Sequence, residues 1–432
     1  MSDDHCLAPW THTYLSPQSE RRLCCASREP AQNFTQYIDA GEGSGTYQPQ
    51  TLEQHWNSEH MKSVRRRMMA GETLPECEVC NHKLLNTSVY RDYFNNMFSG
   101  KREELLRETD VDGYHNGLPI SFDYRIKNTC TFKCRMCGPM LSSAWEAEER
   151  KHNPLFETNN PWAVGENRQA IRKFQQEVAV PELWAAIKER RVSEIYWVGG
   201  EPLDWPEHWE MMRYMVNHGI AKDVYVRYNT NLHKIEHNGN NLYDLLAHFK
   251  DWQICASLDG TGQVGEYIRT GLDFAAWHEN FKQGMIAAKH PRQMRIDFTL
   301  TLPGLMFVQA LAYYANTFSI HGQTSLLAKV VFAFTPDIIM SPLSLPRHIL
   351  DDVVRDLLAD SNVQSHKDLS MVLLHLLDRP NFQEQWPNEY QYELWKGKAR
   401  ILELESRRKD SYTMRDILKM GDKRILEWWD AI

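Results

Sequence analysis

Short apolar runs alternate with longer amphipathic stretches through the middle of this chain. Apolar and polar residues alternate from Ile120 to Ile126, and similar strand-like runs follow at 194–198, 224–228, 252–256, 295–299 and 329–334. Between these runs, apolar residues recur at helical spacing over 168–191, 205–219, 273–289 and 305–318. Strands that alternate with helices favour parallel βαβ units. The pattern therefore predicts an α/β fold whose polar sites lie at the carboxyl ends of the strands.

The two ends of the chain have different patterns. The first part is irregular, except for a helix predicted over 51–70 whose basic end is typical of a solvated face. From about Pro346 the apolar positions again follow helical spacing, with stripes over 349–358 and 369–377. We therefore expect three segments: an irregular domain (1–115), an α/β core (116–340) and a helical C-terminal segment (341–432).

Composition narrows the class of protein. The chain has 432 residues, 42% hydrophobic and 25% charged, which is typical of a soluble globular protein. A net charge of −8 gives no strong indication of nucleic-acid binding. The sequence contains no signal-peptide core and no apolar run of membrane-spanning length, so no membrane partner is expected. Nine cysteines in uneven clusters do not resemble a disulfide framework, which favours a reducing, cytoplasmic location.

Three cysteines, Cys130, Cys134 and Cys137, form a Cys-x3-Cys-x2-Cys motif directly after the first predicted strand. Three thiolates in one loop can hold three corners of a [4Fe–4S] cluster, which normally takes four. One iron then stays open for an exchangeable ligand, as in catalytic rather than structural zinc sites. Zinc is the alternative, but zinc sites usually consist of two ligand pairs, and this triplet has no paired partner nearby.

Glycine or short polar residues follow the next predicted strands. The motif 199–202 places two glycines and Glu201 at a strand end, where a ligand could approach the backbone and an ammonium group could donate to the carboxylate. The next strands end in 228–231 and 257–260, and Arg269 follows shortly afterwards. Each of these is also common turn chemistry. Together they suit a ligand that carries a ribose, an ammonium and a carboxylate.

With the cysteine triplet and these strand ends, residues 118–335 resemble the radical S-adenosylmethionine (SAM) enzymes. The resemblance implies a partial (β/α)6 barrel and a [4Fe–4S] cluster whose open iron is chelated by the amino and carboxylate groups of SAM. It assigns the following cofactor contacts: Gly199, Gly200 and Glu201, with Pro202 of the same motif, at the ammonium; Ser257 and Arg269 near the carboxylate; Asn231 near the ribose; and Met136 by the adenine.

The first segment resembles the auxiliary-cluster module called SPASM, or its shorter twitch form, on the motifs 6–10, 23–26, 56–58 and 74–80. That module usually follows the barrel, whereas here it precedes it. The resemblance implies one auxiliary [4Fe–4S] cluster with these four ligands: Cys6, Cys24, Cys77 and Cys80. The family pattern favours Cys24, and Cys25 stays open as its replacement. A structural zinc at the same positions is the alternative, while Cys255, inside a strand, is expected to be a buried small hydrophobe.

The resemblance also implies an activity. SAM would be cleaved reductively to methionine and a 5′-deoxyadenosyl radical, which abstracts a hydrogen atom from a substrate. Modules of the SPASM type recur in enzymes that modify peptides and proteins, so a peptide or protein substrate is expected by analogy, with a nucleoside or nucleotide as the alternative. A flavodoxin or ferredoxin would supply the low-potential electron. A non-enzymatic zinc-binding interaction protein is the alternative from another class, and no catalytic acid or base can be assigned from the sequence.

Overall fold

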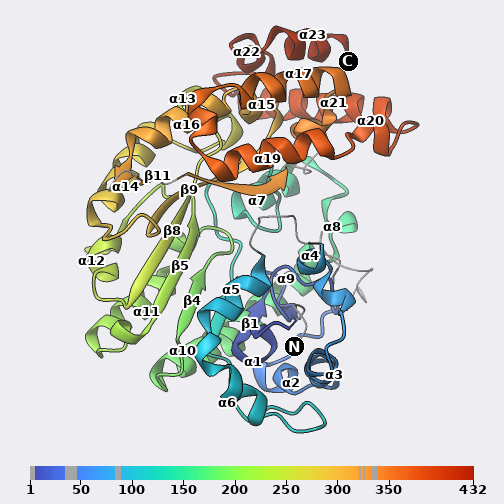
Figure 1. Ribbon diagram of the computed structural model, residues 1–432. Helices are drawn as coiled ribbons and strands as arrows, with labels where there is room; N and C mark the ends of the chain where they lie inside the picture. The colour runs from blue at the N-terminus through green and yellow to red at the C-terminus, as the bar shows by residue number, and fades with distance from the viewer. Residues whose placement is uncertain (1–4, 35–45, 83–88, 321–322, 325, 333–337) are drawn as a thin grey trace. The chain divides into compact units, whose positions relative to one another are not determined.

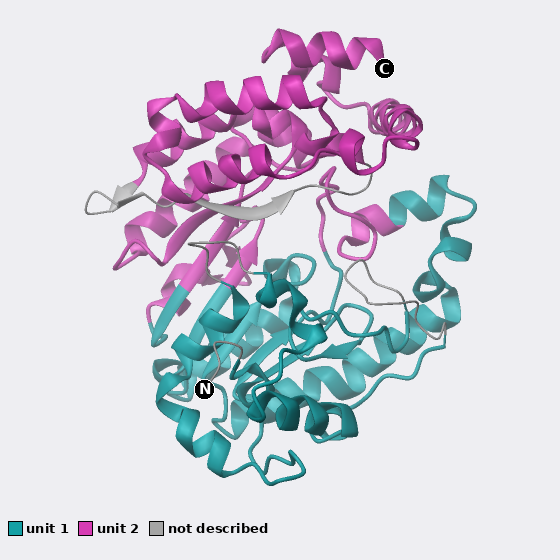
Figure 2. Ribbon diagram, turned by 45° about the vertical axis from the view of Figure 1, so that its right-hand side comes forward, with its two compact units in different colours: residues 1–129, 147–227, 248–252 teal, residues 130–146, 228–247, 253–432 magenta. Residues whose placement is uncertain are grey.

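The computed structural model describes residues 5–34, 46–82, 89–320, 323–324, 326–332 and 338–432. The chain divides into two compact units, coloured separately in Figure 2. Unit 1 comprises 1–129, 147–227 and 248–252, and unit 2 comprises 130–146, 228–247 and 253–432. The boundaries of these two units differ from those of the three predicted segments, so the division at 115 and 340 stays a prediction.

Unit 1 is built on a mostly parallel sheet. Its strands are β1 (His12–Leu15), β2 (Arg21–Arg22), β3 (Ser121–Tyr124), β4 (Glu194–Trp197) and the start of β5 (Tyr225–Thr230). They lie in the order β5-β4-β3-β1-β2, with β1 parallel to β3, β3 parallel to β4, and β2 antiparallel to β1. All four residues of β3 are buried, as expected of a strand covered on both faces.

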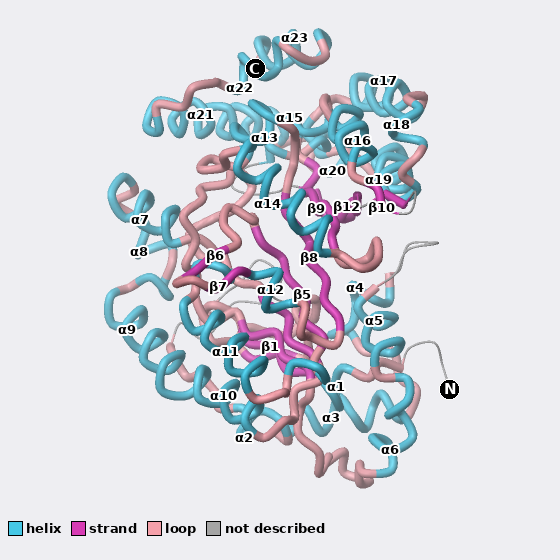
Figure 3. The backbone as a smooth tube through the Cα atoms, turned by 90° about the vertical axis from the view of Figure 1, so that its left-hand side faces the viewer, coloured by secondary structure: helices cyan, strands magenta, loops and turns pink. Residues whose placement is uncertain are grey.

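Helices surround these strands. The helices that lie wholly in unit 1 are α1 (Ala8–Thr11), α2 (Leu52–Trp56), α3 (Glu59–Met69), α4 (Glu78–Asn81), α5 (Tyr90–Met97), α6 (Arg102–Arg107), α8 (Phe156–Asn159), α9 (Gly165–Phe174), α10 (Val180–Lys188) and α11 (Pro206–Asn217). Figure 3 shows α9, α10 and α11 to one side of the magenta strands. Helix α7 (Ser143–His152) has residues in both units.

The single helix predicted over 51–70 is wrong, because two helices occupy this stretch. Helix α2 ends before Asn57, and Ser58 takes an extended backbone with ψ of 159°. The Ser58 side chain accepts a hydrogen bond from the Met61 N–H, so it caps the start of α3. Met61 and Val64 then face the buried core of unit 1.

Unit 2 contains a second set of parallel strands followed by helices. The strands are the end of β5, β8 (Asp251–Ser257), β9 (Met294–Leu300) and β12 (Leu326–Phe332), in the order β12-β9-β8-β5. Two short hairpins pair β6 (Glu236–His237) with β7 (Asn240–Asn241) and β10 (Ser319–Ile320) with β11 (Gln323–Thr324). The pairs β8–β9 and β9–β12 are both parallel.

The helices of unit 2 lie beside and after these strands (Figure 1). They are α12 (Leu242–Leu246), α13 (Gly262–Ile268), α14 (Phe274–Ala287), α15 (Leu302–Leu305), α16 (Val308–Thr317), α17 (Arg347–Leu358), α18 (Ser361–Gln364), α19 (Lys367–Asp378), α20 (Phe382–Gln385), α21 (Tyr390–Arg408), α22 (Met414–Lys419) and α23 (Lys423–Ala431). Helices α17–α23 account for the helical spacing seen in the sequence after about Pro346. Within the described ranges, no helix combines the length and apolar character needed to cross a bilayer.

The α/β class and the mostly parallel sheet are confirmed. The six predicted strands correspond to β3, β4, β5, β8, β9 and β12, while residues 333–334 of the last prediction lie outside the described residues. The partial (β/α)6 barrel stays a prediction. The sequence pattern missed β1, whose four residues are all buried and therefore do not alternate.

Candidate functional site

The Cys130–Cys137 loop belongs to unit 2 and is fixed by backbone hydrogen bonds. The Lys133 N–H donates to the Thr270 carbonyl and the Arg135 N–H to the Ile268 carbonyl, each at 2.8 Å. Cys134 is buried, whereas Cys130 and Cys137 are half-buried. The middle of the loop that carries the three cysteines is therefore paired with the last residue of α13 and the segment that follows it.

Two of the predicted cofactor residues lie beside these sulfur atoms. Asn231 Nδ2 is 3.8 Å from Cys130 Sγ, and Arg269 Nη1 is 4.0 Å from Cys134 Sγ. Nitrogen donors near thiolates stabilise their negative charge and tune the potential of a cluster that they bind. Asn231 and Arg269 thus each contact one of the three loop sulfur atoms.

Asp259 orients the guanidinium of Arg269. Arg269 Nη2 donates to Asp259 Oδ1 at 3.1 Å, and Arg269 Nε forms an ion pair with Asp259 Oδ2 at 2.6 Å. Asp259 Oδ1 also accepts from the Thr299 N–H at 2.7 Å. Since the carboxylate is buried and held from β9, it fixes where Arg269 can place its charge.

Burial controls the protonation of the loop cysteines. It raises the pKa of the Cys134 thiol to about 12, and the nearby Arg269 acts in the opposite direction. Burial also raises the pKa of Cys137. The metal-free thiols of Cys134 and Cys137 are therefore protonated at neutral pH, and metal binding must release their protons.

The Gly199–Gly200 motif lies in unit 1, where close packing explains both glycines. Gly199 has φ of +142°, a backbone conformation that side chains rarely adopt. A Cβ on Gly200 would lie 2.3 Å from the Thr129 carbonyl oxygen. The Glu201 N–H donates to that same oxygen at 2.6 Å. The close approach of the loop residues 127–129, which follow β3, thus requires glycine here, whether or not a ligand also approaches.

Replacing Gly200 with Ala is expected to lower the free energy of unfolding by about 1–3 kcal/mol, the usual range for overpacking. The added methyl group would meet three backbone atoms, at 2.3, 2.6 and 2.8 Å, rather than a flexible side chain. Gly165→Ala is the matched control, because a Cβ there meets nothing within 4 Å. Urea unfolding of both variants measures the difference. Equal stability of the two variants would contradict the packing described here.

The remaining predicted cofactor residues have varied surroundings. Glu201 is buried, and its Oε1 accepts from the Leu203 N–H at 3.0 Å. Pro202 is also buried and starts the short 3-10 turn Pro202–Asp204. Met136 and Ser257 are half-buried in unit 2, with Ser257 as the last residue of β8. Their contacts with a cofactor stay predictions.

The four cysteines predicted for the N-terminal site line one pocket in unit 1: Cys6, Cys24, Cys77 and Cys80. The other residues of its wall are Ala8, Leu23, Ala26, Ser27, Glu76, Tyr90, Arg91 and Phe94. Cys25 is not part of this wall. It shares a hydrogen bond with Tyr90 and has Asp123 and Arg125 as charged neighbours. Cys24 therefore lies in the pocket wall with the other three cysteines, whereas Cys25 does not.

Local structure brings Cys77 and Cys80 together. The 3-10 turn Pro75–Cys77 leads directly into α4, so the two cysteines lie one helical turn apart on the same side. The Cys77 N–H donates to the Leu74 carbonyl at 3.0 Å. Cys6 is held from α3, since its N–H points at Met68 Sδ at 3.3 Å.

Arg91 is the cation of this pocket. Burial raises the pKa of Cys77 to about 11, and Arg91, which donates a hydrogen bond to that thiol, acts in the opposite direction. Burial likewise raises the pKa of Cys6 to about 12. Arg91 is buried, and its Nη2 donates to Asn81 Oδ1 at 2.6 Å. A fixed positive charge at this wall would offset part of the charge of four thiolates.

Four cysteine sulfurs are the donor set that both iron–sulfur clusters and structural zinc take. The pocket itself is small, at about 20 Å³. This is room for about one water molecule, so the thiols must turn outward to admit a cofactor. In the part of the chain that the structure describes, no three His, Cys, Asp or Glu side chains are arranged to hold a metal ion. The four thiols therefore suit an iron–sulfur cluster or zinc chemically, but the pocket must widen before it can hold a cluster.

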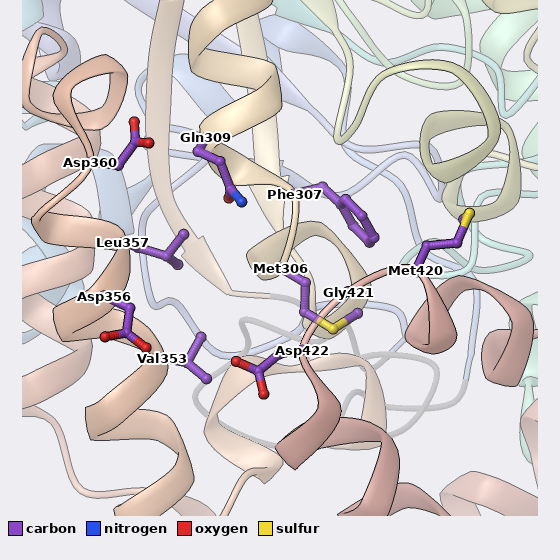
Figure 4. Close-up of a pocket in the computed structure, with 10 residues that line it drawn as sticks. All are labelled: Met306, Phe307, Gln309, Val353, Asp356, Leu357, Asp360, Met420, Gly421 and Asp422. Atoms are coloured by element: carbon purple, nitrogen blue, oxygen red, sulfur yellow. The ribbon is translucent and has the colours of Figure 1, made fainter.

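A second pocket, of about 350 Å³, lies among the helices of unit 2 (Figure 4). Its wall includes three carboxylates that are already engaged. Asp356 and Asp422 both pair with Arg424, at 2.8 and 2.6 Å. Asp360 caps α18 by accepting from the Asn362 N–H at 2.8 Å. This pocket contains none of the predicted site residues.

Comparisons with known proteins do not identify a family for this chain. No protein-family model matches this chain, and no curated protein matches it either. Among solved structures, the crystal structure of SuiB from Streptococcus suis matches with a TM-score of 0.31 and 13% sequence identity. The match covers 70% of this chain and 59% of SuiB, so the chain spans less than two thirds of that protein. A likeness of this size assigns neither a fold family nor a function.

One residue of these candidate sites, Arg91, could not be identified from the sequence. Asp259 is part of the strand-end motif 257–260, so only its pairing with Arg269 is new. Arg91 lies in an ordinary amphipathic helix, α5, and no sequence feature distinguishes it from a solvated arginine. Its role depends on the folded position of α5 beside the four cysteines.

Proposed function

We propose that this chain is a radical SAM enzyme that holds a [4Fe–4S] cluster through Cys130, Cys134 and Cys137. The observation that supports this most is the Cys-x3-Cys-x2-Cys loop with Asn231 and Arg269 beside its sulfur atoms. Three thiolates and two nitrogen donors suit a cluster with one open iron better than they suit a closed four-ligand zinc site.

Within this proposal, the chain's own residues bind and orient the cluster and SAM. When bound, the cluster would supply the electron for cleaving SAM to methionine and a 5′-deoxyadenosyl radical. Arg269, oriented by Asp259, places a positive charge beside Cys134. Residues 199–202 stay the predicted partners of the SAM ammonium group.

We further propose a second cofactor at Cys6, Cys24, Cys77 and Cys80, with an auxiliary [4Fe–4S] cluster preferred. The shared pocket of these four cysteines supports Cys24 rather than Cys25 as the ligand. A structural zinc at the same residues is the alternative, and analysis for acid-labile sulfide separates the two.

The substrate class is proposed by analogy with enzymes that carry a SPASM-like module. A peptide or protein is the first candidate, and a nucleoside or nucleotide is the second. A low-potential flavodoxin or ferredoxin is the proposed electron donor.

The activity can be tested on anaerobically reconstituted protein with dithionite and SAM. Formation of 5′-deoxyadenosine, measured by chromatography, is the expected result. Reconstituted protein that contains iron and sulfide but leaves SAM intact would contradict the proposal.

Cofactor loading is expected to increase between about pH 7 and about pH 8.5, because each ligand thiol must lose a proton. Burial holds the thiol pKa of Cys134 and Cys6 at about 12 and that of Cys77 at about 11, so this whole range lies below them. Iron retained after desalting is the measurement. Retention that falls as the pH rises would contradict the protonation states described above.

A further inference from the structure

Arg135 connects the cysteine loop to the C-terminal segment of the chain. It follows Cys134, and its side chain is completely buried. Its Nε donates to the Tyr267 carbonyl at 3.0 Å, and its guanidinium lies 3.9 Å from the centre of the Tyr267 ring. Its Nη2 forms an ion pair with Asp410. Since a buried arginine is strongly destabilised without its partner charge, Asp410 holds this side chain in place.

Arg408 makes a second connection to the same loop. Its Nη1 donates to the Lys133 carbonyl at 2.9 Å and lies 3.3 Å from Thr270 Oγ1. Its guanidinium also lies over the ring of Trp145, 4.3 Å from the centre, and Trp145 Nε1 donates to the Cys134 carbonyl at 2.8 Å. Arg408 and Trp145 thus donate hydrogen bonds to two successive carbonyls of the cysteine loop, those of Lys133 and Cys134.

Glu405 fixes the turn that carries Asp410. Its Oε1 accepts from the Tyr267 hydroxyl at 2.7 Å and from the Met414 N–H at 2.6 Å. Helix α21 ends at Arg408, and the capping residue Lys409 takes a left-handed conformation with φ of +54°. The chain therefore turns sharply at this point and presents Asp410 to Arg135.

We infer that Glu405, Arg408 and Asp410 form a C-terminal clamp that positions the Cys130–Cys137 loop for its cofactor. The inference rests on the proposed function, because it concerns the same three cysteines. Arg408 contacts a loop carbonyl and Asp410 contacts the Arg135 side chain, while Glu405 fixes the turn that carries Asp410. All three are therefore positioning residues rather than ligands. Partners of this kind, one step removed from a metal, change its retention about ten- to hundredfold when they are lost.

The test compares Asp410→Asn and Arg408→Met with wild-type full-length protein. Asp430→Asn is the control, because it breaks an exposed ion pair with Arg415 in the same segment. Two quantities are measured: the rate of iron release to a chelator after anaerobic reconstitution, and hydrogen exchange of the 130–137 amides in metal-free protein. Arg408 is only half-buried, so its variant serves as the comparison if Asp410→Asn does not fold.

We expect one iron pool to be released about ten- to hundredfold faster in both variants, with faster amide exchange in the loop and no change in the control. Wild-type release rates together with wild-type exchange in both variants would overturn the clamp. If the wild-type protein binds no iron and sulfide while loop exchange still rises in the variants, the clamp is supported as a structural device and the proposed function fails.

Discussion

Replacing Cys134 with Ala is expected to abolish 5′-deoxyadenosine formation and to reduce the iron content by about four atoms per chain, one cluster. Cys134 is the most deeply buried of the three loop cysteines and has the Arg269 guanidinium 4.0 Å from its sulfur. With two thiolates left, the loop could not hold three corners of a cluster. The product is measured by chromatography and the iron by colorimetry, both on anaerobically reconstituted protein.

Cys255→Ala provides the control for this experiment. Cys255 is also a buried cysteine of unit 2, but it lies within β8, where its thiol donates a hydrogen bond to Gln253 Oε1. Iron content and SAM cleavage should remain at wild-type levels in this variant. Undiminished SAM cleavage by Cys134→Ala would contradict the assignment of the cysteine triplet.

Replacing Cys24 with Ala is expected to remove the second cofactor, whereas replacing its neighbour Cys25 should leave it bound. Cys24 lines the pocket with the other three cysteines, while Cys25 is not part of the pocket wall and shares a hydrogen bond with Tyr90. The two variants remove the same chemical group at adjacent positions, so each is the control for the other. Iron, zinc and sulfide counts for both proteins measure the effect.

Sulfide in these counts identifies the second cofactor as a cluster, and zinc without sulfide at this site identifies it as structural zinc. The opposite pattern, with the second cofactor lost from Cys25→Ala and kept by Cys24→Ala, would show that the pocket geometry assigns the wrong cysteine. Loss from neither variant would contradict a four-cysteine site here.

Much of the fold was predictable because strand and helix periods are local properties of the sequence. The alternation from Ile120 to Ile126 and the apolar runs after it correspond to real strands, and the parallel pairing follows from the helices between them. The strand β1 could not be predicted, since His12–Leu15 is short and buried throughout. The break at Ser58 depends on a single capping side chain within a helix-like pattern.

The candidate sites also contain a part that could be predicted from the sequence and a part that could not. Cys130, Cys134 and Cys137 lie within eight residues, so their joint role can be inferred from spacing alone. The contacts of the C-terminal clamp cannot, because Arg135 and Asp410 are 275 residues apart and Asp410 lies in no motif. From the sequence, Gly200 is explained only by the approach of a ligand, whereas the packing of the backbone at 128–129 also requires a glycine there.

The central claim is tested most directly by electron paramagnetic resonance of the anaerobically reconstituted, dithionite-reduced protein, recorded with and without SAM and supported by iron and sulfide counts. The account predicts the signal of a reduced [4Fe–4S] cluster that changes when SAM is added, and its loss in Cys134→Ala. A colourless protein that carries zinc without sulfide at these cysteines would contradict it, as would a cluster signal that SAM leaves unaltered.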